Sequence, residues 1–370
     1  MSRRSWIILG FVFVAVFIAA IAALGAGDKR QEWAKSGHAN RELTQEATVE
    51  ARGVTAAHCG RCHSEQGFKA WLPQLIRGNS GLLVGPDGNP ATVPYLASLG
   101  LTKFSVRPQT CTTCHNDDYS LRVRGDTAVL PAGFQARAVG AGALCMTCHN
   151  TRNGRIQWNA QDAGRFTAPH VAAQADVIMG KNVFLVDYGE NFVSPHAAFT
   201  GNACATCHLK LNPTGHTFKA QKTVCTNCHG SAFNAVFVQE PIEQLIEDLG
   251  KAIGFRILQQ KSRINTIGSW NPKTDQTTEN FAVDNSAITA VELTEIHGQI
   301  GLKITLTGGR ELYSQLGSVK DASGAPTIST RDVIVKASWN YFLFHSDGSK
   351  GVHNPRFART VLGATLEALK

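Results

Sequence analysis

The residues best suited to chemistry fall in five copies of one short string, in which two Cys are separated by two residues and followed at once by His. The copies are Cys59-Cys62-His63, Cys111-Cys114-His115, Cys145-Cys148-His149, Cys204-Cys207-His208 and Cys225-Cys228-His229. Two thiols at this spacing can form thioethers with the two vinyl groups of one porphyrin, and the adjoining His then ligates the iron. Structural zinc does not require that His, and a thioredoxin-like dithiol would occur once. The sequence therefore predicts five c-type haems, which use all 10 Cys.

The other axial position of each iron needs a second ligand. Eight of the 13 His remain after the five proximal ones, so two His on every iron is possible. Methionine is a poor competitor, because apart from Met1 only Met146 and Met179 are present. Bis-histidine ligation lacks the Met ligand that raises the potential, so mostly low-potential centres are expected.

We rank these His by their sequence surroundings. The favoured distal ligands are His38, His170, His196, His216 and His353. His58 is a reserve candidate, because it directly precedes Cys59 and is poorly placed to reach the same iron. His297 and His345 are expected to be structural. A surface or structural role is the alternative for each favoured His.

Short strings around several of these His resemble those of bacterial multihaem c-type cytochromes. They are Trp33–Ala39 (WAKSGHA), Ser194–His196 (SPH), Gly215–Phe218 (GHTF) and Gly351–Pro355 (GVHNP). In these local motifs the chain resembles the group that contains cytochrome c-554-type carriers and pentahaem cytochrome c nitrite reductases. The resemblance implies that such strings carry distal haem ligands. The active haem of those reductases usually has CxxCK, which is absent here, so the resemblance to a nitrite reductase stops at that point.

A chain of irons with both axial positions filled can accept and release electrons but has no position for substrate. The leading interpretation is an electron carrier rather than an enzyme, linking a membrane quinone pool or redox complex to periplasmic or extracellular redox partners. One alternative is a reductase of a small nitrogen or sulfur compound with one open iron, which Arg165, Lys181 or Tyr188 could line. Another is a cytochrome subunit of a larger membrane redox complex.

The first residues predict a membrane anchor. Trp6–Ala26 is apolar and uncharged, and as a helix it would span about 30 Å, the thickness of the bilayer core. Arg3 and Arg4 precede it, which places the start of the chain in the cytoplasm and the rest outside. We expect a single-pass protein of the inner (cytoplasmic) membrane with its bulk in the periplasm or outside; a cleaved signal peptide is the alternative.

The remaining sequence predicts a mainly α fold with irregular loops wrapped around five haems and a small β-rich insertion. We expect an anchor over residues 1–27, a pentahaem domain over 28–233 and a haem-free segment over 234–370 that returns His353 to the haem core. In that last segment, apolar periodicity predicts helices over Glu240–Gly254, Ser329–Phe344 and Pro355–Leu369. Turn signals between short β-rich runs, such as Phe255–Leu258 and Leu302–Leu306, predict the insertion over about 255–325. A helix is also expected over Gln31–Arg52.

The charge of the chain does not indicate a nucleic-acid partner. The formal net charge is +8, with Lys and Arg scattered along the sequence. Five haems would add about ten propionate charges of the opposite sign. No nucleic-acid partner is therefore expected.

Overall fold

The computed structural model describes residues 29–152, 154, 165–187, 192–209, 215–220, 222–271, 276–296 and 298–370. They form two compact units, each assembled from separate stretches of the chain. Unit 1 takes the residues up to Gln74, Leu82–Arg122 and Cys204–Phe233, and unit 2 takes Leu75–Gly81, Val123–Ala203 and Asn234–Lys370. The last stretch of unit 2 begins at Asn234, and Val123–Ala203, which carries the third string, belongs to the same unit.

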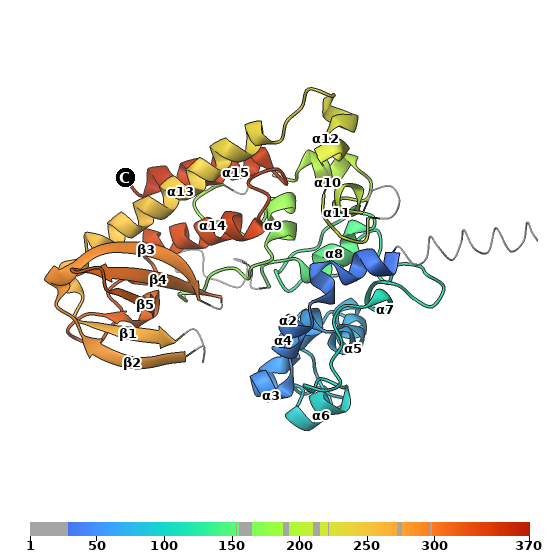
Figure 1. Cartoon of the computed structure of the whole chain (residues 1–370), viewed down its shortest axis with the longest axis horizontal. Coiled ribbons are helices and arrows are strands. Elements are labelled where there is room, and N and C mark those ends of the chain that lie inside the picture. The colour runs from blue at the N-terminus through green and yellow to red at the C-terminus, as the bar shows by residue number, and fades with distance from the viewer. Residues whose placement is uncertain are drawn as a thin grey trace, which may run out of the picture. The chain divides into compact units, whose positions relative to one another are not determined.

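Unit 1 is built from short helices joined by loops, as expected for a segment rich in Gly, Asn and Thr (Figure 1). The helices are η1 (Gly37–Ala39), α2 (Arg41–Gln45), α3 (Val49–Arg52), η2 (Gly53–Thr55), α4 (Ala56–His63), α5 (Glu65–Ile76), α6 (Val93–Ser98), α7 (Cys111–Cys114), α11 (Cys204–His208) and α12 (Lys222–His229). The single helix expected over Gln31–Arg52 is wrong, because this segment is divided. Asn40 begins a new helix by accepting a hydrogen bond from the backbone N of Leu43 (3.0 Å).

Close backbone packing joins α4 to α5 in unit 1. A Cβ at Gly67 would lie 2.2 Å from the carbonyl oxygen of Gly60, so only glycine fits where the two helices meet. Arg61, inside the first Cys string, is buried and places its guanidinium 5.0 Å from the ring centroid of Trp71, which is also buried. This cation–π contact fixes the first string against α5.

Unit 2 has three long helices and shorter ones that carry site residues. They are α8 (Gly142–Cys148), α9 (Gln174–Met179), α10 (Pro195–Phe199), α13 (Val236–Leu258), α14 (Val333–Asp347) and α15 (Pro355–Ala368). The long helices α13, α14 and α15 pack against one another (Figure 1). Pro355 lies in the first turn of α15, which confirms its expected place.

The core of unit 2 follows the apolar stripe of α13. Ile242, Ile246, Leu249, Ile253 and Ile257 recur at helical spacing and are all buried. This stripe continues past the predicted end at residue 254, so the strand expected over 255–258 is wrong and is the last turn of α13. The helix also begins earlier than expected, at residue 236.

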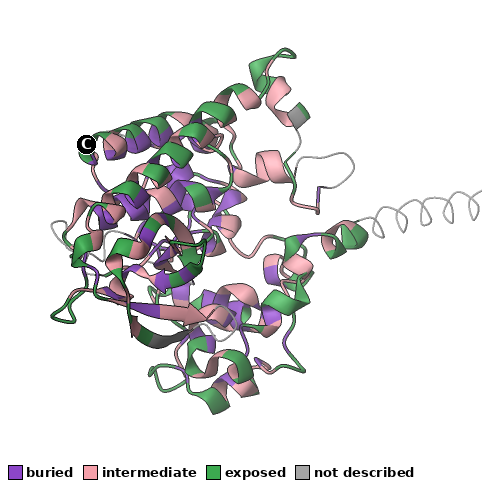
Figure 2. Ribbon diagram, turned by 60° about the vertical axis from the view of Figure 1, so that its left-hand side comes forward, coloured by how far each residue is buried: buried purple, intermediate pink, exposed green. Residues whose placement is uncertain are grey.

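The β-rich part of unit 2 lies inside the predicted insertion. Its strands are β1 (Thr266–Asn271), β2 (Gln276–Ala282), β3 (Ile288–Ile296), β4 (Gln299–Leu306), β5 (Glu311–Gln315) and β6 (Val319–Lys320), with η4 (Lys261–Arg263), η5 (Asn285–Ala287) and η6 (Leu316–Ser318) between them. They form two antiparallel sheets of order β2-β1-β6 and β3-β4-β5. Helix α13 packs against β3, and a Cβ at Gly254 would lie 2.1 Å from the carbonyl oxygen of Val291. Buried residues are concentrated between these helices and strands (Figure 2).

The fold class expected from the sequence needs correction on the membrane helix. Within the part of the chain that the structure describes, no helix combines the length and apolar character needed to cross a bilayer. The expected span Trp6–Ala26 lies outside the described residues. The prediction of a fold with an N-terminal transmembrane helix, and with it a single-pass inner-membrane location, is therefore wrong for the described chain. That chain is helical with two antiparallel sheets.

Candidate haem-binding site

Each of the five Cys strings lies on one turn of helix. The first, fourth and fifth end α4, α11 and α12, whose last residues are His63, His208 and His229. In α7 and α8 the His is the residue that follows the last turn, His115 and His149. Side chains three positions apart share one face of a helix, so each pair of Sγ atoms can be presented to one ring edge. The arrangement fits covalent attachment of a porphyrin at every string.

Three proximal imidazoles are oriented by a partner at Nδ1. Nδ1 of His115 lies 2.8 Å from the carbonyl oxygen of Tyr119, and Nδ1 of His208 lies 2.8 Å from that of Phe218. Nδ1 of His149 lies 3.3 Å from Oε1 of Gln174. A carbonyl can only accept, so Nδ1 carries the proton and Nε2 keeps its lone pair. This is the tautomer that a metal ligand requires, held in place as ligating His usually are.

Two favoured distal His lie beside the fourth string in unit 1. The ring of His38 meets that of Phe218 edge-on, with centroids 4.4 Å apart, and the ring of His216 is 6.0 Å from the same phenyl ring. Phe218 is also the residue whose carbonyl accepts from His208. The backbone N of His216 donates to Glu32 (2.9 Å), which ties this loop to the start of the described chain. Three His of unit 1 thus converge on one phenylalanine.

The fourth and fifth strings are neighbours, as the short segment between them predicts. Burial raises the pKa of the Cys207 thiol, and the nearby thiols of Cys225 and Cys228 raise it further. Beyond the fifth string, His229 stacks on Phe233 with centroids 4.7 Å apart. Two attachment sites therefore lie side by side in unit 1.

The third string is connected to His353 through two side chains of unit 2. Gln174, which faces His149, donates from Nε2 to the carbonyl oxygens of Ser346 (3.4 Å) and Asp347 (3.1 Å). The carboxylate of Asp347 is buried and lies 2.6 Å from Nδ1 of His353. Burial lowers the pKa of His353, but the charge and hydrogen bond of Asp347 outweigh it and raise the pKa. The hydrogen bond from Nδ1 to the carboxylate fixes the ring and makes Nε2 the nitrogen that can face a metal.

The turn that carries His353 lies between α14 and α15, as expected, and is held by its neighbour. Asn354 is buried and donates from Nδ2 to the carbonyl oxygens of Val177 (3.0 Å) and Phe192 (2.6 Å). Its Oδ1 accepts from the backbone N of Phe357 at the start of α15 (3.3 Å). These bonds fix the turn against α9.

The remaining candidates are dispersed. His170 lies in a loop whose backbone N donates to the carbonyl of Thr151 (3.4 Å), and His196 lies in α10, which packs on α9. His58 lies in α4, as part of the turn before Cys59. His345 is exposed and stacks on Tyr341, with centroids 5.5 Å apart. His297 lies outside the described residues.

The residues suggested for an open reductase site are not assembled by the described contacts. Arg165 is exposed, and the backbone N of Lys181 donates to the carbonyl of Asp176 (2.8 Å). Tyr188 lies outside the described residues. Among those that the structure describes, no group of three or more His, Cys, Asp or Glu is arranged to hold a bare metal ion.

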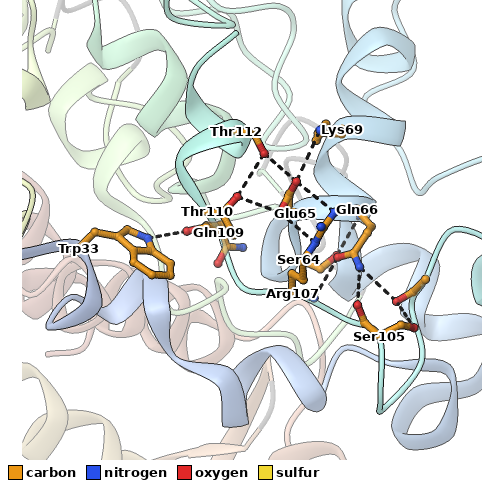
Figure 3. A network of polar contacts seen from close by, with 12 residues as sticks. Trp33, Ser64, Glu65, Gln66, Lys69, Ser105, Arg107, Gln109, Thr110 and Thr112 are labelled. Atoms are coloured by element: carbon orange, nitrogen blue, oxygen red, sulfur yellow. Dashed lines mark hydrogen bonds and ion pairs between the residues drawn. The ribbon is translucent and has the colours of Figure 1, made fainter. Parts of the chain in front are cut away.

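A buried glutamate joins the first and second strings (Figure 3). Glu65, two residues after His63, accepts from the hydroxyls of Thr110 (2.8 Å) and Thr112 (2.7 Å), which flank Cys111. Arg107 (3.2 Å) and Lys69 (3.5 Å) form ion pairs with the same carboxylate. Only 4% of the Glu65 side chain is exposed. The carboxylate thus fixes the start of α7 relative to the end of α4.

Gln109 makes a second connection between the same strings. Its side chain donates to the carbonyl oxygen of Cys62, and its own carbonyl accepts from Nε1 of Trp33 (2.7 Å) (Figure 3). Trp33 begins the string that ends in His38 and Ala39. The contacts of Gln109 therefore connect the first and second strings of unit 1 to the segment that carries the candidate distal ligand His38.

The titration of Glu65 predicts acid sensitivity of unit 1. Burial raises its pKa, but the hydrogen bonds of Thr112 and Thr110 and the charges of Arg107 and Lys69 outweigh burial, so the pKa lies below its ordinary value of 4.5. A carboxyl with a depressed folded-state pKa stabilises the fold above its unfolded pKa and loses that contribution as pH falls through the folded value. We expect Glu65→Gln to lower the free energy of unfolding by about 2 kcal/mol at pH 7. It should also flatten the pH dependence below pH 4.5, measured by urea titration.

The matched control is Glu42→Gln, which removes an exposed carboxylate from α2 of the same unit. It should change the free energy of unfolding by less than about 0.5 kcal/mol. Equal losses in the two variants would show that Glu65 does not clamp the strings.

Sequence reasoning found the Cys strings but missed the residues that orient them. Glu65, Gln109, Gln174 and Asp347 hold the strings or their His through tertiary contacts between distant parts of the chain. The one local signal is that Thr110 and Thr112 flank Cys111 with short hydroxyls. Such residues seek acceptors, but their sequence does not indicate which carboxylate they meet.

Comparison with known proteins gives little that bears on this site. No protein-family model matches the chain, and no curated protein matches it. Among solved structures, the outer cell wall cytochrome OcwA is similar at 15% sequence identity with a TM-score of 0.48. The similarity covers 92% of this chain and 50% of that one, so the chain spans about half the length of OcwA. A likeness at this level carries no argument about function.

Proposed function

We propose that the chain is a pentahaem c-type cytochrome that carries electrons between redox partners. The proposal is supported by five strings that each present two Cys on one helical turn, with the His at the end of that turn or directly after it. The observation that carries it is the fixed Nδ1 of His115, His149 and His208, because it prepares Nε2 for iron. When bound, each haem would supply reversible one-electron oxidation and reduction.

The chain's own residues would hold the irons and restrict their chemistry. The Cys pairs tether each ring, and the proximal His fill one axial position. His38 and His216, whose rings lie near Phe218 beside the fourth string, and His353, whose Nδ1 is held by Asp347, would supply distal imidazoles. With imidazole on both sides, iron has no position for a small substrate, so electron transfer is favoured over reductase chemistry.

Electrons would enter and leave unit 1 through its surface strings. Cys111 of the second string and Cys228 of the fifth are exposed, whereas the other string cysteines are partly covered. An attached ring edge at either place would therefore lie near solvent and within reach of a docked protein. The partner class that fits is another redox protein rather than a nucleic acid.

The number of attached haems tests the proposal. Intact-mass measurement of the purified holoprotein should show five covalent haems, and Cys225→Ala combined with Cys228→Ala should show four. Fewer than five in the unchanged protein, or five in the double variant, would contradict the assignment. An iron that turns over nitrite, hydroxylamine or a sulfur oxyanion would favour a reductase instead.

A further inference from the structure

A buried carboxylate lies beside the third string of unit 2. Asp176, in the first turn of α9, has 0% of its surface exposed. Thr151 donates to it from its backbone N and its Oγ1, both at 2.8 Å, and Nδ2 of Asn182 donates at 2.5 Å. Thr151 follows the proximal ligand His149 by two residues. Every group bonded to this carboxylate in the described structure is uncharged.

The first turn of α9 also positions His149. The backbone N of Ala175 donates to the carbonyl oxygen of His149 (3.0 Å), and Gln174 accepts from its imidazole (3.3 Å). One turn of helix therefore carries, in consecutive residues, both contacts to the proximal ligand and the buried carboxylate.

Burying a carboxylate among neutral donors is costly unless a positive charge lies near it. Burial raises the pKa of Asp176 to about 6, against the lowering effect of Asn182 and Thr151. The helices packed against α9 carry His196 in α10 and Lys336, Tyr341, His345 and Asp347 in α14. Arg152, Lys181 and His353, which pairs with Asp347, are ionisable residues of unit 2 outside the helices. The carboxylate of Asp176 accepts its hydrogen bonds from Thr151 and Asn182, and none comes from the side chains of these ionisable residues.

We propose that Asp176 is a proton-accepting group coupled to the iron at the third string. Its carboxylate would balance the positive charge of the ferric site, and it would take one proton from solvent when that site gains one electron from a redox partner. This inference rests on the proposed function, because it requires haem at Cys145 and Cys148.

The coupling fixes the direction of the pH dependence. A ferric site favours the carboxylate and so lowers its pKa relative to the ferrous state. At a pH between the ferric-state pKa and the ferrous-state pKa of Asp176, reduction is accompanied by uptake of a proton. The reduction potential of this one centre should therefore fall as pH rises, over a pH range near 6. A tenfold change in proton concentration corresponds to at most about 59 mV for one electron.

The test is a potentiometric titration of the holoprotein from pH 4 to pH 8, with infrared difference spectra of its reduced and oxidised forms. We expect one pH-dependent centre, absent from the Cys145→Ala, Cys148→Ala double variant, and an infrared signal of a carboxylic acid formed on reduction. Asp176→Asn should abolish the pH dependence and the infrared signal, and it should raise the reduction potential of the haem at the third string. The control, Asp248→Asn, removes an exposed carboxylate of α13 and should change neither.

A second variant retains the carboxylate and so covers a failure of Asp176→Asn to fold. Thr151→Val removes one donor to the carboxylate, which should move the pH window upward. An unchanged window, or an infrared spectrum without the carboxylic acid, would overturn the coupling while leaving five attached haems intact. Absence of haem at the third string, seen by mass, would instead overturn the proposed function itself.

Discussion

His353→Ala should open one of the five irons to external ligands. The Asp347 carboxylate fixes Nδ1 of His353 at 2.6 Å, so Nε2 is the atom available for ligation. Removing the imidazole leaves one axial position empty. We expect one high-spin ferric centre in five, measured by electron paramagnetic resonance, which binds cyanide and becomes low-spin.

His345→Ala is the matched control for this substitution. His345 lies in α14 of the same unit but is exposed and stacks on Tyr341. Its removal should create no high-spin signal. His353→Met, in contrast, should keep the iron low-spin and raise its potential, because a Met ligand favours the reduced state. A His353→Ala protein with an unchanged spectrum would remove His353 from the ligand set.

Trp339→Ala should cause the largest loss of stability in unit 2. Trp339 is fully buried in α14, meets Phe184 edge-on with centroids 6.4 Å apart, and donates from Nε1 to the carbonyl oxygen of Asn182 (2.6 Å). Truncating a buried Trp to Ala lowers the free energy of unfolding by about 3–5 kcal/mol. Urea titration followed by circular dichroism measures this loss.

Trp339→Phe separates ring packing from the hydrogen bond. It keeps most of the buried ring but leaves the Asn182 carbonyl without its donor, so we expect a smaller loss of about 1–3 kcal/mol. If Trp339→Ala cost less than about 1 kcal/mol, the packing described for α14 would be wrong.

The sequence predicts most successfully where one local pattern determines the structure. The apolar spacing of Ile242, Leu249 and Ile253 gave the main body of α13, and Pro355 marked the first turn of α15. The strand expected over 255–258 failed because β-branched and aromatic residues also continue a buried helical stripe, as Ile257 does. Short apolar runs cannot distinguish these two structures.

Long-range contacts explain the rest of what the sequence could not predict. The covalent spacing of the Cys strings is local, so they could be identified directly. The acceptor that orients each His is not local: Gln174 reaches His149 from 25 residues away. Glu65 is similarly separated from Thr110 by 45 residues. The division of the chain into two units also depends on how distant stretches meet, which no single segment encodes.

The most direct test of the central claim is the spin state of iron in the purified, fully oxidised protein, measured by electron paramagnetic resonance alongside the haem count. Five haems with only low-spin ferric signals, unchanged by cyanide or nitrite, are the predicted result. A high-spin centre in the unaltered protein that binds these ligands would show that one iron lacks a second His, and would contradict the electron-carrier account.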